Sequence, residues 1–130
     1  MKKSVTIVVL FMVISMFNCI PKRQQGITVV STEEKKILLD LDKVQLVDVR
    51  TSAEYKAGHI ANSQNIDFNS PSFQDDIAAL DKEKPVILYC QKGTRSAKCA
   101  NEMAKAGFKL IYDLEGGFSK WEHINLDLKL

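Results

Sequence analysis

Short apolar runs alternate with amphipathic segments along most of this chain, a pattern typical of an α/β protein. Strands are expected at residues 28–30, 44–49, 65–68, 86–89 and 109–114. Helices are expected at residues 31–41, 51–57, 70–80, 96–106 and 117–123. Strands and helices in this order form right-handed βαβ units, so we predict a parallel β-sheet with helices on both faces.

The starts and ends of several helices are marked by specific residues. Residues 31–34 and 51–54 have the spacing of a capping box, in which a Ser or Thr side chain and a Glu side chain cap each other's backbone N–H. Ser70-Pro71 is typical of an N-cap followed by proline at the first helical position. Gly58 and Gly107 are expected to end the helices that precede them.

The N-terminus has the features of an export signal. Lys2 and Lys3 precede an almost wholly apolar run at 5–17, which is short for a transmembrane helix but typical of a secretory signal peptide. We therefore divide the chain into a signal peptide at 1–18, a polar tether at 19–27 and one folded domain at 28–130. The expected location is the periplasm or the cell envelope.

Cys19 ends this N-terminal segment. Residues 15–19, Ser-Met-Phe-Asn-Cys, resemble a bacterial lipobox, although the usual Leu-Ala-Gly before the cysteine is absent. The resemblance implies that Cys19 is lipidated and holds the protein on a membrane without a spanning segment. The alternatives are ordinary cleavage nearby, with an incidental cysteine, and a retained anchor followed by Lys22 and Arg23.

Charge argues against nucleic acid as a partner. The full chain has 18 basic and 16 acidic residues, and loss of residues 1–18 removes Lys2 and Lys3 and balances the two. The sequence also has no basic stripe or aromatic platform, so nucleic-acid binding is not expected.

The segment around Cys90 has the strongest chemical signal. The apolar strand at 86–89 ends at this cysteine, and a helix is expected to begin six residues later. Free backbone N–H groups and the helix dipole at such a junction bind anions and stabilise a thiolate. Lys92 and Arg95 add two cations to the loop. The alternative is that Cys90 is only a small buried apolar residue.

Four motifs in register resemble the rhodanese (thiosulfate sulfurtransferase) family over roughly residues 28–125. They are Cys90-x-x-Gly93-x-Arg95-Ser96, Leu46-Val47-Asp48-Val49-Arg50 with Glu54-Tyr55, Gly58-His59-Ile60 through Asn65-Ile66, and Glu115-Gly116-Gly117-Phe118 with Trp121. In the third motif Asn62-Ser63 stands where Gly-Ala is usual.

This resemblance implies a rhodanese-like fold and an enzyme that carries sulfur on Cys90 as a persulfide. The expected donor is thiosulfate or another sulfane-sulfur compound, the expected acceptor is cyanide or a thiol, and neither a cofactor nor a metal is expected. The residues expected to bind the substrate are those of the loop: Gln91, Lys92, Gly93, Thr94, Arg95 and Ser96.

Two other functions stay open. A cysteine phosphatase or arsenate reductase also places a thiolate at the head of a helix, but cysteine phosphatases have five residues between Cys and Arg, whereas Cys90 and Arg95 enclose four. A non-catalytic rhodanese-like binding module is the second alternative.

Supporting roles are expected for several other residues. Asp48 and Arg50 are expected to hold the loops around the site, and Cys99 is expected to face the core, with a resolving thiol as its alternative. His59 is expected to be structural rather than a proton carrier. Glu54 is expected to complete its capping box, and Trp121 is expected to be a packing anchor.

Overall fold

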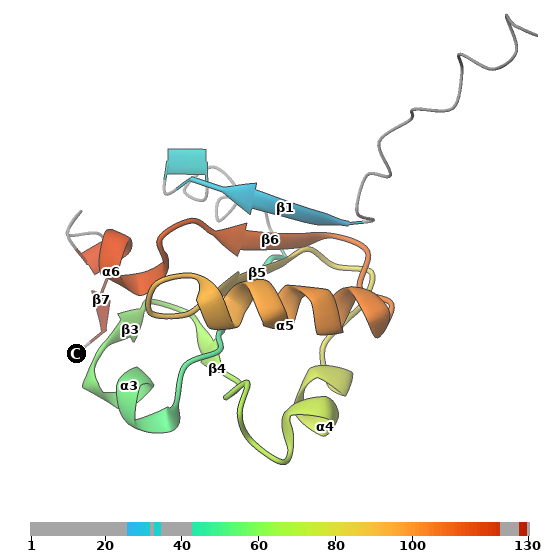
Figure 1. Cartoon of the computed structure of the whole chain (residues 1–130), viewed down its shortest axis with the longest axis horizontal. Coiled ribbons are helices and arrows are strands. Elements are labelled where there is room, and N and C mark those ends of the chain that lie inside the picture. The colour runs from blue at the N-terminus through green and yellow to red at the C-terminus, as the bar shows by residue number, and fades with distance from the viewer. Residues whose placement is uncertain (1–25, 32, 35–42, 123–127, 130) are drawn as a thin grey trace, which may run out of the picture.

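The computed structural model describes residues 26–31, 33–34, 43–122 and 128–129, and its main feature is a five-stranded parallel sheet (Figure 1). The strands lie in the order β1-β6-β5-β2-β4. Their bounds are β1 Ile27–Val30, β2 Gln45–Asp48, β4 Gln64–Asn65, β5 Val86–Tyr89 and β6 Ile111–Leu114. A second, two-stranded antiparallel sheet joins β3 (His59–Ile60) to β7 (Leu128–Lys129).

Helices cover both faces of the parallel sheet, as predicted. On one face α4 (Phe73–Ala78) and α5 (Thr94–Lys105) bury Phe73, Ile77, Ala100 and Met103 against the sheet. On the other face α6 (Gly117–Glu122) buries Phe118 and Trp121. Helix α3 (Ser52–Ala57) has no buried residue and begins four residues after the last residue of β2.

The central strand β5 explains why the sheet can be covered on both sides. All four of its residues are buried, and their side chains alternate between the two cores. Val86 and Leu88 face α4 and α5, whereas Ile87 and Tyr89 face α6. A continuous apolar run of this kind is what a buried parallel strand requires.

Both predicted capping boxes are present. Thr51 and Glu54 cap each other at the start of α3, and Gly58 follows as its C-cap. Ser31 and Glu34 make the equivalent pair of bonds, 2.8 Å and 3.2 Å long. Most of the helix predicted at 31–41 lies outside the described residues.

Some predicted boundaries are wrong. Helix α4 begins at Phe73 with Ser72 as its N-cap, because the Ser70 side chain bonds to Ser72 within the preceding turn. Helix α5 begins at Thr94, two residues earlier than predicted, and β1 includes Ile27. The strand predicted at 65–68 is shorter and lies at Gln64–Asn65, and β6 lacks the first two of the residues predicted for 109–114.

The carboxyl ends of the parallel strands meet at one edge of the sheet, where ligands bind in open α/β folds. Arg50 follows β2, Cys90 follows β5 and the turn at 115–116 follows β6 at this edge. Three of the four sequence motifs are therefore brought together by the topology. Among the described residues, no helix is long and apolar enough to cross a membrane.

Candidate active site

The Cys90 sulfur lies in a ring of hydrogen-bond donors between β5 and α5. The Gly93 backbone N–H donates to Sγ over 3.0 Å, and the Ser96 hydroxyl lies 3.5 Å from it. Gly93 is the N-cap of α5, with a φ of 109° and no side-chain cap. A glycine accepts this left-handed conformation without strain and leaves the first turn of α5 open toward the sulfur.

The surroundings of Cys90 favour the thiolate. Burial raises the pKa of Cys90, but hydrogen bonds from Ser96 and from the backbone N–H groups of Gly93 and Lys92 outweigh it and hold the pKa below its ordinary value. Cys99 shows the opposite behaviour, because burial raises its pKa to about 12. Cys99 is fully buried in the core, as predicted, and would be an unreactive thiol at neutral pH.

Helix α6 holds the loop that follows Cys90 through backbone hydrogen bonds. The Phe118 N–H donates to the Cys90 carbonyl over 2.8 Å, and the Ser119 N–H donates to the Gln91 carbonyl over 3.0 Å. Gly117 is needed for this approach, because a Cβ atom there would lie 2.3 Å from the Cys90 carbonyl oxygen. Gly117 of the closing Gly-Gly motif therefore lets α6 fix the backbone of Cys90 and Gln91.

The Arg95 guanidinium forms an ion pair with the Glu54 carboxylate. Its two terminal nitrogens each donate to a carboxylate oxygen of Glu54 over 2.8 Å. The same carboxylate accepts from Thr51 in the capping box of α3. Hydrogen bonding to Arg95, helped by Thr51, lowers the pKa of Glu54 to about 2. Glu54 thus joins the first turn of α5 to α3, a role beyond the capping expected from sequence.

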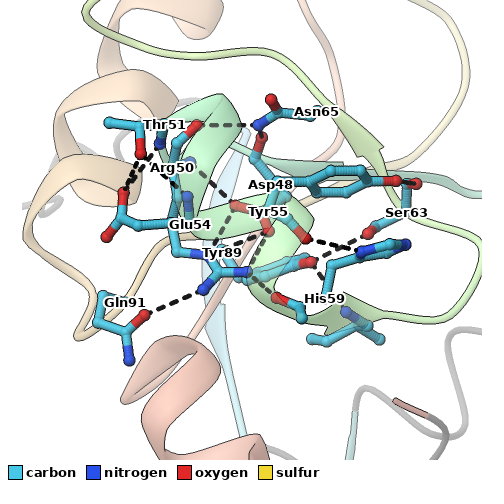
Figure 2. A network of polar contacts seen from close by, with 12 residues as sticks. Asp48, Arg50, Thr51, Glu54, Tyr55, His59, Ser63, Asn65, Tyr89 and Gln91 are labelled. Atoms are coloured by element: carbon cyan, nitrogen blue, oxygen red, sulfur yellow. Dashed lines mark hydrogen bonds and ion pairs between the residues drawn. The ribbon is translucent and has the colours of Figure 1, made fainter. Parts of the chain in front are cut away.

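Asp48 and Arg50 form a buried ion pair that supports the loop (Figure 2). The Arg50 guanidinium donates to both Asp48 oxygens, to the Gly58 carbonyl over 2.7 Å and to Gln91 Oε1 over 3.0 Å. It also lies over the Phe118 ring, 4.0 Å from the centroid. Arg50 therefore connects β2, the end of α3, the loop that follows Cys90 and α6.

The Gln91 side chain is fixed within this network. Its oxygen accepts from Arg50, and its nitrogen donates to Ser119 Oγ over 2.9 Å. Lys92 and Thr94, by contrast, are exposed on the rim of the loop. Among the residues expected to bind substrate, Lys92 is therefore the cation exposed to solvent. Gln91 instead supports the loop through its bonds to Arg50 and Ser119.

A second part of the network braces the segment between α3 and β4 (Figure 2). His59 stacks on Tyr55 with ring centroids 3.7 Å apart, and its Nδ1 lies 2.9 Å from the Tyr55 carbonyl. The Tyr55 hydroxyl donates to the Ser63 carbonyl, and the buried Tyr89 hydroxyl bonds to Ser63 Oγ and the Ile60 N–H. This arrangement fits a structural role for His59.

Comparisons with known proteins identify one family over most of the chain. The rhodanese-like domain family matches residues 31–124, which is most of the chain. The chain belongs to the rhodanese-like domain family. The thiosulfate sulfurtransferase GlpE of Tolumonas auensis is 31% identical over 98 residues, which cover 75% of this chain and 90% of that protein. The uncharacterized protein YqhL of Bacillus subtilis is 40% identical over 98 residues, which cover 75% of each protein.

Solved rhodanese-like structures share the fold. A rhodanese-like domain protein from Staphylococcus aureus is 32% identical and has a TM-score of 0.65, with 72% of this chain and 90% of that chain covered. A rhodanese-related protein from Thermoplasma volcanium is 25% identical and has a TM-score of 0.69, with 78% and 97% covered. The rhodanese-like fold predicted from the motifs is therefore confirmed.

Sequence reasoning missed three contributors to the site. Ser119 holds Gln91, Gly58 supplies a carbonyl to Arg50, and Glu54 pairs with Arg95. The spacing of Glu54 gave no signal for an ion pair, because a capping box already accounts for a glutamate there. Cys19 lies outside the described residues, and no cluster of metal-ligating side chains occurs within the described part of the chain.

Proposed function

We propose that this rhodanese-like domain is a sulfurtransferase that moves sulfane sulfur from thiosulfate, or a persulfide donor, to cyanide or a thiol acceptor. The observation that carries the proposal is the Cys90 sulfur itself. It is buried, yet its pKa is lowered by surrounding hydrogen-bond donors. A relative named thiosulfate sulfurtransferase matches three quarters of the chain.

The first half-reaction forms a persulfide. The Cys90 thiolate attacks the outer sulfur of thiosulfate, a new S–S bond forms, and the S–S bond of thiosulfate breaks so that sulfite leaves with the electron pair. Lys92, exposed on the loop, attracts the dianion, and the first-turn donors of α5 receive the negative charge of the terminal sulfur.

The second half-reaction returns the enzyme to its starting state. A cyanide or thiolate acceptor attacks the terminal sulfur, and Cys90 leaves as a thiolate. The donors that stabilise the thiolate before the cycle, Gly93 N–H and Ser96 among them, also make it a good leaving group. The cycle needs no cofactor, and its kinetics are expected to be ping-pong.

The position of Arg95 favours sulfur transfer over phosphate or arsenate chemistry. A phosphoryl group needs donors for three equatorial oxygens, and arginine is suited to bind two of them at once. The two terminal nitrogens of Arg95 are instead bound to Glu54. The short segment from Cys90 to Arg95 therefore suits the binding of one added sulfur atom better than the binding of a phosphate group.

The proposal is tested by parallel assays on the same preparation. Thiosulfate–cyanide turnover should be lost in Cys90→Ser and kept in Cys99→Ser, while phosphate-ester hydrolysis stays absent in all three proteins. Turnover that survives Cys90→Ser would contradict the proposal. A wild type without sulfur transfer and without a persulfide on Cys90 would favour the binding-module alternative.

We also propose that the chain is exported and lipid-anchored at Cys19. This rests on the sequence of residues 1–19 alone. Expression in a bacterial host followed by membrane fractionation and mass spectrometry of the mature N-terminus tests it. An acylated Cys19 in the membrane fraction, lost in Cys19→Ala, is the expected result. A soluble mature protein that begins elsewhere would contradict the anchor.

A further inference from the structure

Gln91 comes directly after the nucleophile, and Ser119 of α6 binds it at two points. The Ser119 N–H donates to the Gln91 carbonyl over 3.0 Å, and Ser119 Oγ accepts from Gln91 Nε2 over 2.9 Å. The other side-chain atom, Gln91 Oε1, accepts from Arg50 over 3.0 Å (Figure 2). Because arginine has only donors, the Gln91 oxygen must face Arg50, and the Gln91 nitrogen must therefore face Ser119. The proposed sulfur-transfer cycle assigns no role to Ser119.

These bonds fix the direction of the peptide group between Gln91 and Lys92. In a planar trans peptide the C=O and the following N–H point in opposite directions. The Gln91 carbonyl points at Ser119 in the first turn of α6, where N–H groups have no partner within the helix. The Lys92 N–H therefore points away from α6.

The Cys90 sulfur lies on the side toward which the Lys92 N–H points. Cys90 belongs to the core cluster that includes buried residues of α5, whereas Phe118 of α6 belongs to the cluster on the other face of the sheet. The next amide along the loop, the Gly93 N–H, donates to Sγ over 3.0 Å. Lys92 and Gly93 thus offer successive N–H groups to the sulfur, which agrees with the part that both have in lowering the pKa of Cys90.

Rotation of this peptide group would reverse its effect on the sulfur. The Gln91 carbonyl oxygen would then face Sγ, where it would repel the thiolate and the terminal sulfur of a persulfide. The Lys92 side chain is exposed, so its packing does not prevent the rotation. The bonds between Gln91 and its neighbours are what hold the peptide in place.

We propose that Ser119 is a positioning residue whose hydroxyl holds the Gln91 side chain and so keeps the Gln91 carbonyl turned toward α6 and the Lys92 N–H turned toward the Cys90 sulfur. Arg50 holds the same side chain from the end of β2. The inference rests on the proposed function, since it concerns the same nucleophile. It applies to both half-reactions, because the thiolate and the persulfide need the same donors.

The substitution that tests this role leaves the charges around Cys90 in place. Ser119→Ala exchanges one uncharged side chain for another and keeps the backbone N–H. The charged groups that the neighbouring elements bring to this edge of the sheet include three ion pairs and two further residues: Asp48–Arg50, Glu54–Arg95, Glu115–Lys120, Lys92 and Asp113. A change in the ionisation of Cys90 in this variant would therefore come from hydrogen bonding.

The pH dependence of Cys90 alkylation tests this role without a sulfur donor. The full chain is treated with iodoacetamide across pH, and mass spectrometry resolves each cysteine. Ser119→Ala should raise the pH midpoint for Cys90 by about half a unit to one unit, which is about a three- to tenfold loss of thiolate near neutral pH. Ser119→Thr keeps the hydroxyl and should restore the wild-type midpoint. An unchanged midpoint in Ser119→Ala would overturn the proposal, whereas a wild type that forms no persulfide would contradict only the proposed function.

Two more variants show whether Ser119 acts through Gln91. Gln91→Met keeps the length of the side chain and removes both of its bonds, so Ser119→Ala added to it should cause no further shift. Ser52→Ala is the matched control, because Ser52 also lies in the first turn of a six-residue helix but is exposed, and its midpoint should be that of the wild type. The proposal fails if Ser119→Ala causes an equal shift in both backgrounds, or if Ser52→Ala causes the same shift.

Two further readouts separate a positioning role from a general effect on the fold. Cys99 is fully buried and should stay unlabelled in Ser119→Ala, as in the wild type. Labelling of Cys99 in this variant would mean that Ser119 supports the whole fold rather than the loop, and this would overturn the proposal. In nuclear magnetic resonance spectra of the wild type, the Lys92 amide proton should shift as Cys90 ionises. A Lys92 resonance that does not respond would contradict the orientation of that N–H.

Discussion

Replacement of Glu54 by glutamine tests whether the ion pair with Arg95 holds the first turn of α5, next to Cys90, in place. Glutamine can still complete the capping box with Thr51, so the substitution removes the charge and spares the cap. A fall in pKa from 4.5 to about 2 corresponds to about 3 kcal/mol at full strength. Because the paired side chains are 33% and 27% exposed, solvent screening should reduce the loss to about 1 to 2 kcal/mol.

The pH dependence of this loss has a definite sign. The folded-state pKa of Glu54 is lowered, so its contribution to stability is complete above about pH 4.5 and disappears as the pH falls toward 2. Urea unfolding of the wild type and Glu54→Gln should therefore show a difference at pH 7 that shrinks through this range. Turnover in the thiosulfate–cyanide assay should fall together with stability, because Arg95 lies in the first turn of α5, directly after the loop that follows Cys90.

Two controls make the comparison specific. Glu34→Gln alters the other capping box, which has no arginine bound to it in the described structure, and should change the free energy of unfolding by less than about 0.5 kcal/mol. Arg95→Gln should have the same effect as Glu54→Gln, and the double variant should lose little more than either. Wild-type stability and turnover in Glu54→Gln at pH 7 would refute the reasoning.

Three further outcomes are expected from single substitutions. Lys92→Ala should raise the KM for thiosulfate more than it lowers kcat. The defect should shrink in high salt, because Lys92 is an exposed charge. A rise in KM matched by an equal fall in kcat would contradict this. Cys99→Ser should keep most of the turnover but lose about 1 to 3 kcal/mol in urea unfolding, because a hydroxyl replaces a fully buried thiol. Gly117→Ala should destabilise the protein and reduce turnover far more than Gly107→Ala. Both glycines have positive φ, but only a Cβ at Gly117 would clash with the Cys90 carbonyl. Similar losses in the two variants would argue against the close approach of α6.

The parts of the site that sequence could predict are those set by local chemistry. An apolar run that ends at Cys90 and is followed by a glycine and a helix specifies a strand, a loop and a helix N-terminus without distant contacts. The capping boxes at 31–34 and 51–54 are likewise local, and both are present. Parallel topology then brings Arg50 and Cys90 to one edge.

The contacts that sequence could not predict join residues far apart in the chain. Glu54 and Arg95 are separated by 41 positions, and each has a sufficient local explanation without the other. The start of α4 was misplaced because Ser70 uses its side chain in a turn with Ser72 instead of capping the helix.

The central claim is that Cys90 carries the transferred sulfur. Intact-protein and peptide mass spectrometry after thiosulfate treatment tests it most directly. The account predicts one added sulfur on Cys90 in the wild type and in Cys99→Ser, none in Cys90→Ser, and loss of that sulfur on addition of cyanide. A persulfide on Cys99, or none on Cys90 in a preparation that turns over thiosulfate, would contradict the account.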